Sequence, residues 1–276
     1  MNTKMINSTY LKYQKCAHYI RTKSLYITSK SGSSHIGSCL SVADILAVIF
    51  TDHLKKKNFN NNSSYYFSRL RLIFSKGHAA AALYSALNYI GLISNNKFET
   101  YGKNGSQLMT HVSSKVPGVE FSTGSLGHGL PHAIGRALSL KLNNSKSKVI
   151  CILSDGELNE GSNWEAFQFI AHHKLDNLLI IIDKNQLQGL SETKNIIELS
   201  SFSQIMKNFN FKVFDIDGHS IPKIKKSIDC ALSYKKNSSI IIANTVKGKG
   251  IKFMESKVEW HYKSLNFKKL NEIKIQ

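Results

Sequence analysis

Cysteine and long apolar runs are both scarce in this sequence. Only four cysteines occur in 276 residues, and none lies two or three positions from another. This spacing excludes a disulfide framework and a zinc-ribbon motif, and it is typical of free thiols in a reducing compartment. No apolar run approaches the roughly 18 residues of a membrane-spanning helix. The polar segment "MNTKMINSTYLKYQKCAHYI" lacks the apolar core of a secretory signal. We therefore expect a cytoplasmic protein without a membrane partner.

Acidic residues and arginine are scarce as well. The chain has 18 Asp and Glu against 37 Lys and Arg, which gives a net charge of +19, but only four of the basic residues are arginines. Nucleic-acid sites favour clustered arginine, whose guanidinium group contacts bases in a bidentate fashion, whereas the lysines here are spread along the chain. We therefore expect no nucleic-acid partner, and only a general preference for anionic small molecules.

The apolar residues that are present indicate an α/β fold. Two continuous runs, "VICIL" at 149–153 and "LLIII" at 178–182, are typical of buried parallel strands. A second succession of strand, helix and strand covers 211–217, 221–235 and 239–244. Further helices are expected at 9–29, 42–54, 77–91, 131–143 and between the two apolar runs, with a short strand at 70–74. This order predicts a doubly wound, mostly parallel sheet flanked by helices, with ligands bound at the carboxyl ends of the strands.

Carboxylates concentrate where the first apolar run ends, in "ILSDGELNEGSNWEAF". An Asp-Gly pair alone is more often a simple turn, but Gly156 also allows a phosphate to approach the backbone closely. A carboxylate at Asp155 beside a diphosphate requires a cation between them, and Mg²⁺ bridges carboxylate and phosphate oxygens. The neighbouring strand end supplies a second oxygen ligand in Asn185, and the Leu187 carbonyl can supply a third. The pattern therefore favours a magnesium diphosphate site.

The SDG motif followed thirty residues later by Asn (185 − 155) resembles the thiamine diphosphate motif of the transketolase family. Five further stretches resemble that family in the same order: "SSHIGSCLSVADIL" at 33–46, "SKGHAAAALYSAL" at 75–87, "THVSSKVPGVEFSTGSLGHGLPHAIGRAL" at 110–138, "DIDGHSI" at 215–221 and "TVKGKGIKFMESKVEWH" at 245–261. The resemblance implies a single thiamine diphosphate-binding (PP) domain over 1–276, with about 250–276 as a C-terminal extension. Ser154 departs from the motif, which begins with Gly in the family.

The resemblance also implies roles for individual residues. Magnesium would be bound by Asp155, Asn185 and the Leu187 carbonyl. The cofactor would be bound by His35, His78, Gly124, Leu126, Asp155, Gly156, Glu157, Asn185 and His261. The catalytic histidines would be His35, His78, His111 and His261, and Glu160 and Glu165 would lie at a subunit interface. Glu157 itself is interpreted as a solvated acid at a helix N-terminus. A site role and a turn role explain His219 equally well.

The function implied by the resemblance is that of a transketolase, which transfers a two-carbon ketol unit from a ketose to an aldose with thiamine diphosphate and Mg²⁺, for which Ca²⁺ or Mn²⁺ can substitute. In the family the glutamate that activates the cofactor belongs to a second domain. We therefore expect this chain to be the N-terminal subunit of a split enzyme, with a separate C-terminal partner in a heterotetramer. The alternatives are a subunit of another thiamine diphosphate enzyme, of the deoxyxylulose-phosphate-synthase or E1 α type, and a non-catalytic cofactor-binding subunit. Phosphorylated and unphosphorylated sugars are both open.

Overall fold

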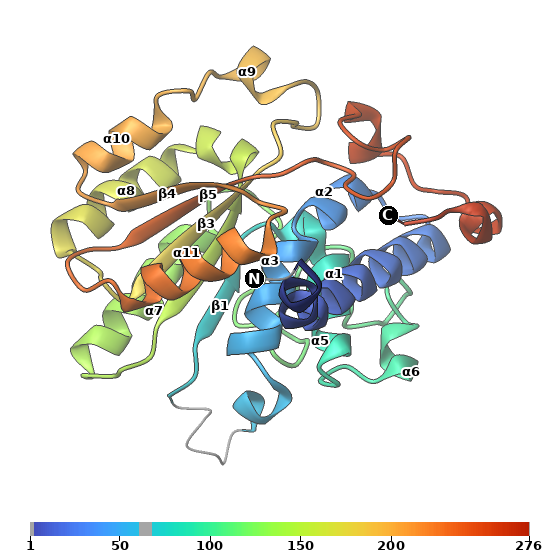
Figure 1. Cartoon of the computed structure of the whole chain (residues 1–276), viewed down its shortest axis with the longest axis horizontal. Helices are drawn as coiled ribbons and strands as arrows, with labels where there is room; N and C mark the ends of the chain where they lie inside the picture. The colour runs from blue at the N-terminus through green and yellow to red at the C-terminus, as the bar shows by residue number, and fades with distance from the viewer. Residues whose placement is uncertain (1–2, 61–67, 276) are drawn as a thin grey trace.

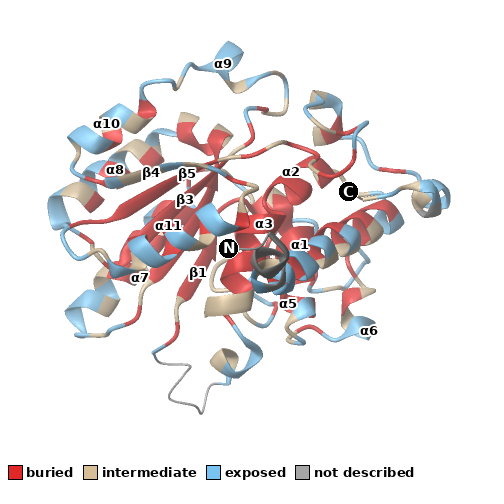
Figure 2. Ribbon diagram, in the orientation of Figure 1, coloured by how far each residue is buried: buried red, intermediate tan, exposed pale blue. Residues whose placement is uncertain are grey.

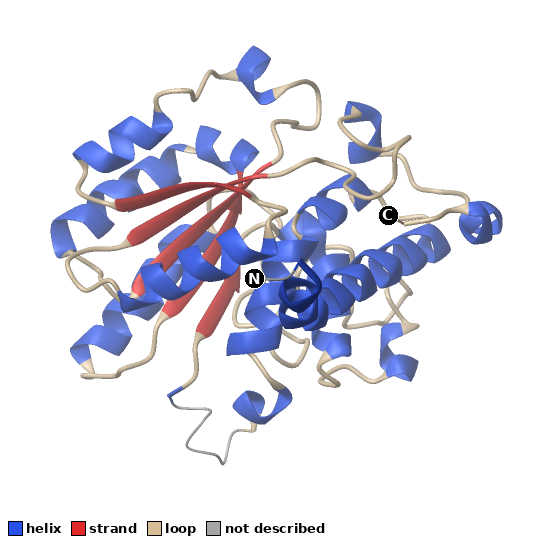
Figure 3. Cartoon of the chain, viewed as in Figure 1, coloured by secondary structure: helices blue, strands red, loops and turns tan. Residues whose placement is uncertain are grey.

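A five-stranded sheet forms the centre of the protein. The structure is a computed structural model that describes residues 3–60 and 68–275. All neighbouring strands are parallel, in the order β1-β2-β3-β5-β4. The strands are β1 (Arg71–Phe74), β2 (Val149–Ser154), β3 (Leu178–Lys184), β4 (Lys212–Asp217) and β5 (Ser239–Asn244). Figure 3 shows the sheet with helices on both sides. The predicted fold, a doubly wound parallel sheet flanked by helices, is confirmed.

Alternate residues of the central strands face two different hydrophobic cores. In β3, Leu179 and Ile181 belong to one core, while Leu178, Ile180 and Ile182 belong to the other. Successive side chains of a strand point to opposite faces of the sheet, so a strand that is covered on both faces needs apolar residues throughout. Figure 2 shows the resulting buried centre of the sheet. This double burial explains why the runs at 149–153 and 178–182 contain no polar position.

The helices fall into two groups, one for each face (Figure 1). The first core is covered by α1 (Thr3–Ser31), α2 (Ile36–Ser41), α3 (Ala43–Val48), α5 (Ala80–Tyr89) and α11 (Ile221–Ser233). The second is covered by α7 (Gly129–Leu142), α8 (Gly161–His173) and α10 (Phe202–Asn208). The short helices α6 (Asn95–Phe98) and α9 (Thr193–Ile196) lie in connections. In the described part of the chain, no helix combines the length and apolarity needed to cross a membrane.

The helices expected from the sequence are present, with two local differences. The helix expected over 42–54 is α3 followed by a π-helical turn, Ile49–His53, and the helix expected over 77–91 begins with a 3₁₀ turn, Gly77–Ala79, before α5. Such irregular turns are common at the ends of helices. Residues 250–275 contain two further 3₁₀ turns, Val258–His261 and Phe267–Glu272, and the side chains of Leu270, Ile273 and Ile275 pack against the first core.

Four connecting segments meet at the carboxyl edge of the sheet. They follow β1, β2, β3 and β5, which are adjacent in the sheet. The register places Ser154 beside Asp183, and Asp183 beside Ala243. Because the strands are parallel, the residues that follow each of them emerge at the same edge. This arrangement brings together sequence motifs that are far apart along the chain.

Candidate active site

A pocket of about 390 Å³ opens at this carboxyl edge. Its lining includes all four predicted catalytic histidines and all three predicted metal ligands. It also includes every residue predicted to bind the cofactor, with the exception of Glu157. These residues come from the segments after β1, β2, β3 and β5, from the start of α2 and from the 110–126 loop. The fold therefore gathers the motifs that the sequence singled out into one cavity.

The four histidines form a cluster around His35. The ring centroid of His35 lies 5.4 Å from that of His78, 5.7 Å from that of His111 and 4.8 Å from that of His261. The backbone of His35 is left-handed (φ 70°), and its N–H donates to the carbonyl of His261 at 2.9 Å. A non-glycine residue in this conformation is uncommon and often occurs at functional sites. The local backbone thus aims His35 at the centre of the cluster.

Burial keeps these imidazoles neutral. It lowers the pKa of His35 to about 4, with further lowering from His111 and Lys247. Burial likewise lowers the pKa of His261 to about 3, and that of His78 well below its ordinary value. A neutral imidazole has one donor and one acceptor nitrogen. At neutral pH these three rings can therefore donate to and accept from hydroxyl groups.

Asp155, Asn185 and Leu187 provide the oxygen atoms of the pocket floor. Asp155 is 2% exposed, and its Oδ2 accepts from the backbone N–H of Gln186 at 2.6 Å. Burial, together with the charge of Asp183, raises the pKa of Asp155 to about 6. Among the described residues, no lysine or arginine forms an ion pair with this carboxylate, so its negative charge is poorly compensated. Carboxylate, amide and carbonyl oxygens are the ligands preferred by hard divalent cations, and the site therefore fits such a cation.

A cluster of three or more His, Cys, Asp or Glu residues able to hold a metal does not occur among residues 3–60 and 68–275. The predicted set contains only one carboxylate, so it is of a different kind. The Oδ1 of Asn185 accepts from the N–H of Leu187 at 3.1 Å, and the carbonyl of Leu187 accepts from the ammonium group of Lys247 at 3.3 Å. A cation held by these three groups would have to draw its remaining ligands from a bound anion or from water.

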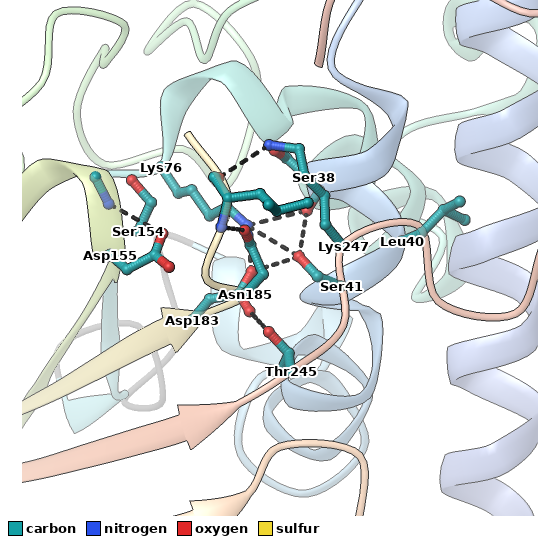
Figure 4. Close-up of polar contacts among 12 residues, drawn as sticks. Ser38, Leu40, Ser41, Lys76, Ser154, Asp155, Asp183, Asn185, Thr245 and Lys247 are labelled. Atoms are coloured by element: carbon teal, nitrogen blue, oxygen red, sulfur yellow. Dashed lines mark hydrogen bonds and ion pairs between the residues drawn. The ribbon is translucent and has the colours of Figure 1, made fainter. Parts of the chain in front are cut away.

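A buried ion pair beneath the pocket was missed by the sequence analysis. Lys76 and Asp183 are both fully buried and form a salt bridge (Figure 4). The ammonium group of Lys76 also donates to the carbonyl of Ser38 and to the hydroxyl of Ser41, while Asp183 accepts from Ser41 and Thr245. A buried pair is tolerated when its remaining donors and acceptors are satisfied in this way. Each residue stands two positions from a predicted site residue, His78 or Asn185, which is the signal that was available.

Lys247 was also missed. It is 1% exposed, lines the pocket, and places its ammonium group 2.8 Å from Nδ1 of His261. Burial, followed by repulsion from Lys76, lowers the pKa of Lys247 to about 8. An ammonium group that donates to Nδ1 leaves the proton of the neutral imidazole on Nε2. Lys247 therefore contributes positive charge to the pocket and orients His261.

The interpretation of Glu157 as a solvated acid is wrong. Its side chain is fully buried and does not line the pocket. Oε1 accepts from the hydroxyl of Ser75 at 2.5 Å and from the N–H of Gly127 at 3.3 Å, while Oε2 accepts from the N–H of Ser154 at 3.0 Å. Burial raises the pKa of Glu157, although these hydrogen bonds oppose the increase. The sequence could not indicate this role, because the donors come from three separate loops.

The 110–126 loop and the start of α8 account for the other predicted residues. Gly124 packs against His111, because a Cβ placed on it would lie 3.4 Å from that ring. The side chain of Leu126 is half-buried at the pocket wall. Glu160 and Glu165 are exposed at the start of α8 and do not line the pocket. Their predicted role at a subunit interface stays a prediction.

Comparisons with known proteins agree with this geometry. The family model described as "Transketolase, thiamine diphosphate binding domain" matches residues 12–276. One of the two named subunits of the apulose-4-phosphate transketolase of Actinobacillus succinogenes is 39% identical over 263 residues, which cover 93% of this chain and 92% of that protein. Human transketolase is 35% identical over 250 residues, which cover 90% of this chain and 39% of that protein.

Solved structures give the same result. The crystal structure of transketolase from Campylobacter jejuni matches with a TM-score of 0.85 and 28% identity, over 100% of this chain and 44% of that one. This chain therefore spans less than half the length of the human and Campylobacter proteins. The match of the family model over nearly the whole chain decides the assignment. The chain belongs to the transketolase family and corresponds to its thiamine diphosphate-binding domain.

Proposed function

We propose that this chain is the N-terminal subunit of a two-subunit transketolase. The enzyme would transfer a two-carbon ketol unit from a ketose, or its phosphate, to an aldose, or its phosphate. Support comes from the Actinobacillus relative, which is named as a transketolase subunit and of which the chain covers 92%, and from human transketolase, of which it covers 39%. The partner would be a separate C-terminal subunit with the pyrimidine-binding half, in an α₂β₂ heterotetramer.

The observation that carries this proposal is the composition of the pocket. One cavity is lined by the poorly compensated carboxylate of Asp155, the oxygens of Asn185 and Leu187, and the ammonium group of Lys247. A Mg²⁺ ion, or Ca²⁺ or Mn²⁺ in its place, would compensate Asp155 and take its remaining ligands from a diphosphate. Gly156 would let that diphosphate approach the backbone. Positive charge from Lys247 would attract the same anion.

The histidines would act on the substrate. Thiamine diphosphate, when bound, supplies the nucleophilic carbon for the ketose carbonyl. His35, His78 and His261 are neutral, so each can donate a hydrogen bond to a sugar oxygen or accept a proton from a hydroxyl group. The His261 Nε2–H that Lys247 enforces would be a donor. His111 is exposed at the opening, where it would meet the substrate first.

Three further features are proposed for the assembled enzyme. Exposure of Glu160 and Glu165 at the start of α8 is compatible with the predicted subunit interface. We also propose that residues 1–276 form a single domain with a C-terminal extension from about 250. A cytoplasmic location is proposed because all four cysteines are free thiols, which persist in reducing compartments.

Reconstitution tests the proposal. The chain is co-expressed with candidate partner subunits, beginning with the product of an adjacent reading frame, and ketol transfer is measured with several ketoses and aldoses. We expect activity from the complex only. Activity of the purified chain alone at the rate of the complex would refute the split enzyme.

Variants of the complex test the site. Asp155→Ala together with Asn185→Ala should abolish Mg²⁺-dependent binding of thiamine diphosphate, measured by calorimetry. Asp229→Ala on the exposed face of α11 is the matched control and should leave binding unchanged. Equal uptake of the cofactor by the double variant and the control would show that the metal site has been assigned incorrectly.

A further inference from the structure

The DGH turn after β4 packs against the segment that carries Lys247. The N–H of Gly218 donates to the carbonyl of Asn244 at 2.7 Å. A Cβ on Gly218 would lie 2.4 Å from the side chain of Thr245, a distance too short for any other residue at this position. The turn therefore fits tightly against the chain where it leaves β5, two residues before Lys247 enters the pocket.

His219 links this turn to a buried ion pair. The backbone N–H of Val246 donates to Nε2 of His219 at 2.8 Å, and Nδ1 of His219 lies 2.8 Å from Oδ2 of Asp44. A backbone N–H can only donate, so Nε2 must be the acceptor, and the ring proton must be on Nδ1, where it is donated to Asp44. The hydrogen bonds thus fix a neutral imidazole in one tautomer.

Asp44 holds His219 in place. Its carboxylate accepts from the guanidinium of Arg21 at 3.1 and 2.5 Å, and both side chains are about nine-tenths buried. Burial alone would raise the pKa of Asp44, but the hydrogen bond from His219 and the charge of Arg21 outweigh it and keep the pKa below its ordinary value. A continuous chain of contacts therefore runs from α1, through α3 and His219, to the backbone of Val246.

The segment from Thr245 to Gly248 is also anchored on its other side. The N–H of Thr245 donates to the carbonyl of Lys184 at 3.0 Å, and the N–H of Gly248 donates to the carbonyl of Gly37 at 2.9 Å. Between these two points the N–H of Val246 is held by His219. The next side chain, Lys247, points into the pocket and reaches His261 and the Leu187 carbonyl. The direction of Lys247 thus depends on the backbone that His219 holds.

We propose that His219 is a positioning residue for Lys247. Its imidazole, oriented by Asp44 and Arg21, fixes the backbone at Val246 so that the ammonium group of Lys247 faces the diphosphate end of the pocket. His219 does not line the pocket, so it acts through Lys247. The ligand part of this inference rests on the proposed function, whereas the backbone part does not.

Two matched variants separate the two hydrogen bonds of the ring. In His219→Asn the amide can replace Nδ1 as a donor to Asp44, but it is too short to accept from Val246. In His219→Gln the longer side chain can place an acceptor near Nε2, but it loses the bond to Asp44. Hydrogen exchange of the Val246 amide is measured in the full chain without cofactor. We expect exchange to be faster by about five-fold or more in His219→Asn, as for the loss of one net hydrogen bond, and within two-fold of the original in His219→Gln. Equal exchange in the two variants would overturn the proposal.

A second readout connects His219 to Lys247. Thiamine diphosphate and Mg²⁺ are titrated into the full chain assembled with its partner, and the dissociation constant is measured. We expect His219→Asn to weaken binding several-fold, His219→Gln to retain it, and His219→Asn to have no further effect in a Lys247→Met background. An equal loss in both backgrounds would show that His219 does not act through Lys247. If no variant and not even the original complex binds the cofactor, the proposed function fails, while the exchange experiment still decides whether His219 fixes the backbone.

Discussion

Replacing Asp155 with asparagine should stabilise the metal-free chain. The carboxylate is nearly fully buried, and burial together with Asp183 raises its pKa from an ordinary value of 3.8 to about 6. Asparagine has almost the same shape and carries no charge. Its side-chain oxygen can still accept from the N–H of Gln186, which donates to Asp155 at 2.6 Å. The substitution therefore removes the cost of a buried charge and keeps the main hydrogen bond.

The magnitude follows from the difference in proton affinity between the folded and unfolded chains. A tenfold difference corresponds to about 1.4 kcal/mol, so the rise to about 6 corresponds to about 3 kcal/mol. Because the folded pKa of Asp155 is raised, the cost is absent below pH 3.8, grows as the pH rises toward 6, and is constant above that. Loss of a weaker hydrogen bond offsets about 1 kcal/mol. The variant should therefore be about 2 kcal/mol more stable than the original chain at pH 7 and slightly less stable at low pH.

Urea unfolding of the chelator-treated chain, followed by circular dichroism from pH 4.5 to 7.5, measures this difference. The advantage of the asparagine variant should grow by about 2 kcal/mol between pH 4.5 and 7. Asp229→Asn, at an exposed position on α11, is the control and should change stability by less than about 0.5 kcal/mol at each pH. If Asp155→Asn is less stable than the original chain at pH 7, the argument that this carboxylate is poorly compensated is incorrect.

Three further predictions concern the surroundings of the pocket. Glu157→Ala leaves the N–H of Gly127 and two other buried donors without an acceptor, so it should lower the free energy of unfolding by about 3 to 6 kcal/mol, whereas the glutamine variant should lose less. Lys76→Met leaves Asp183 charged and unpaired in the interior and should cost about 3 to 5 kcal/mol, with part of the loss recovered at lower pH where Asp183 is protonated. Gly77→Ala places a Cβ 2.4 Å from the backbone of the 110–126 loop and should cost about 1 to 3 kcal/mol. Urea unfolding measures each change, and a variant as stable as the original chain would contradict the contact from which it was predicted.

The strands and most helices could be predicted from the sequence because their signals are local. A run such as "LLIII" has no polar position, and only a strand covered on both faces uses such a run in a parallel sheet. The order of the strands was not available from this pattern. β5 lies between β3 and β4, and its place depends on which surfaces pack together, a property of the whole chain.

The pocket shows the same division between local and distant information. Asp155 and Asn185 were recognised because each directly follows a strand, and parallel strands end at one edge. Lys76, Lys247 and Glu157 were missed or misinterpreted because nothing in their flanking residues indicates that they are buried. A charged side chain is buried only where distant segments supply its partners.

The sequence by itself therefore determined the periodic elements, the family and the residues that mark the ends of strands. Tertiary structure decided which charges are paired, which carboxylate lacks compensation, and why the histidine of the DGH turn accepts from Val246. The physical reason is that hydrophobic periodicity depends on near neighbours along the chain, whereas the protonation and orientation of a buried polar group depend on atoms brought close only by folding.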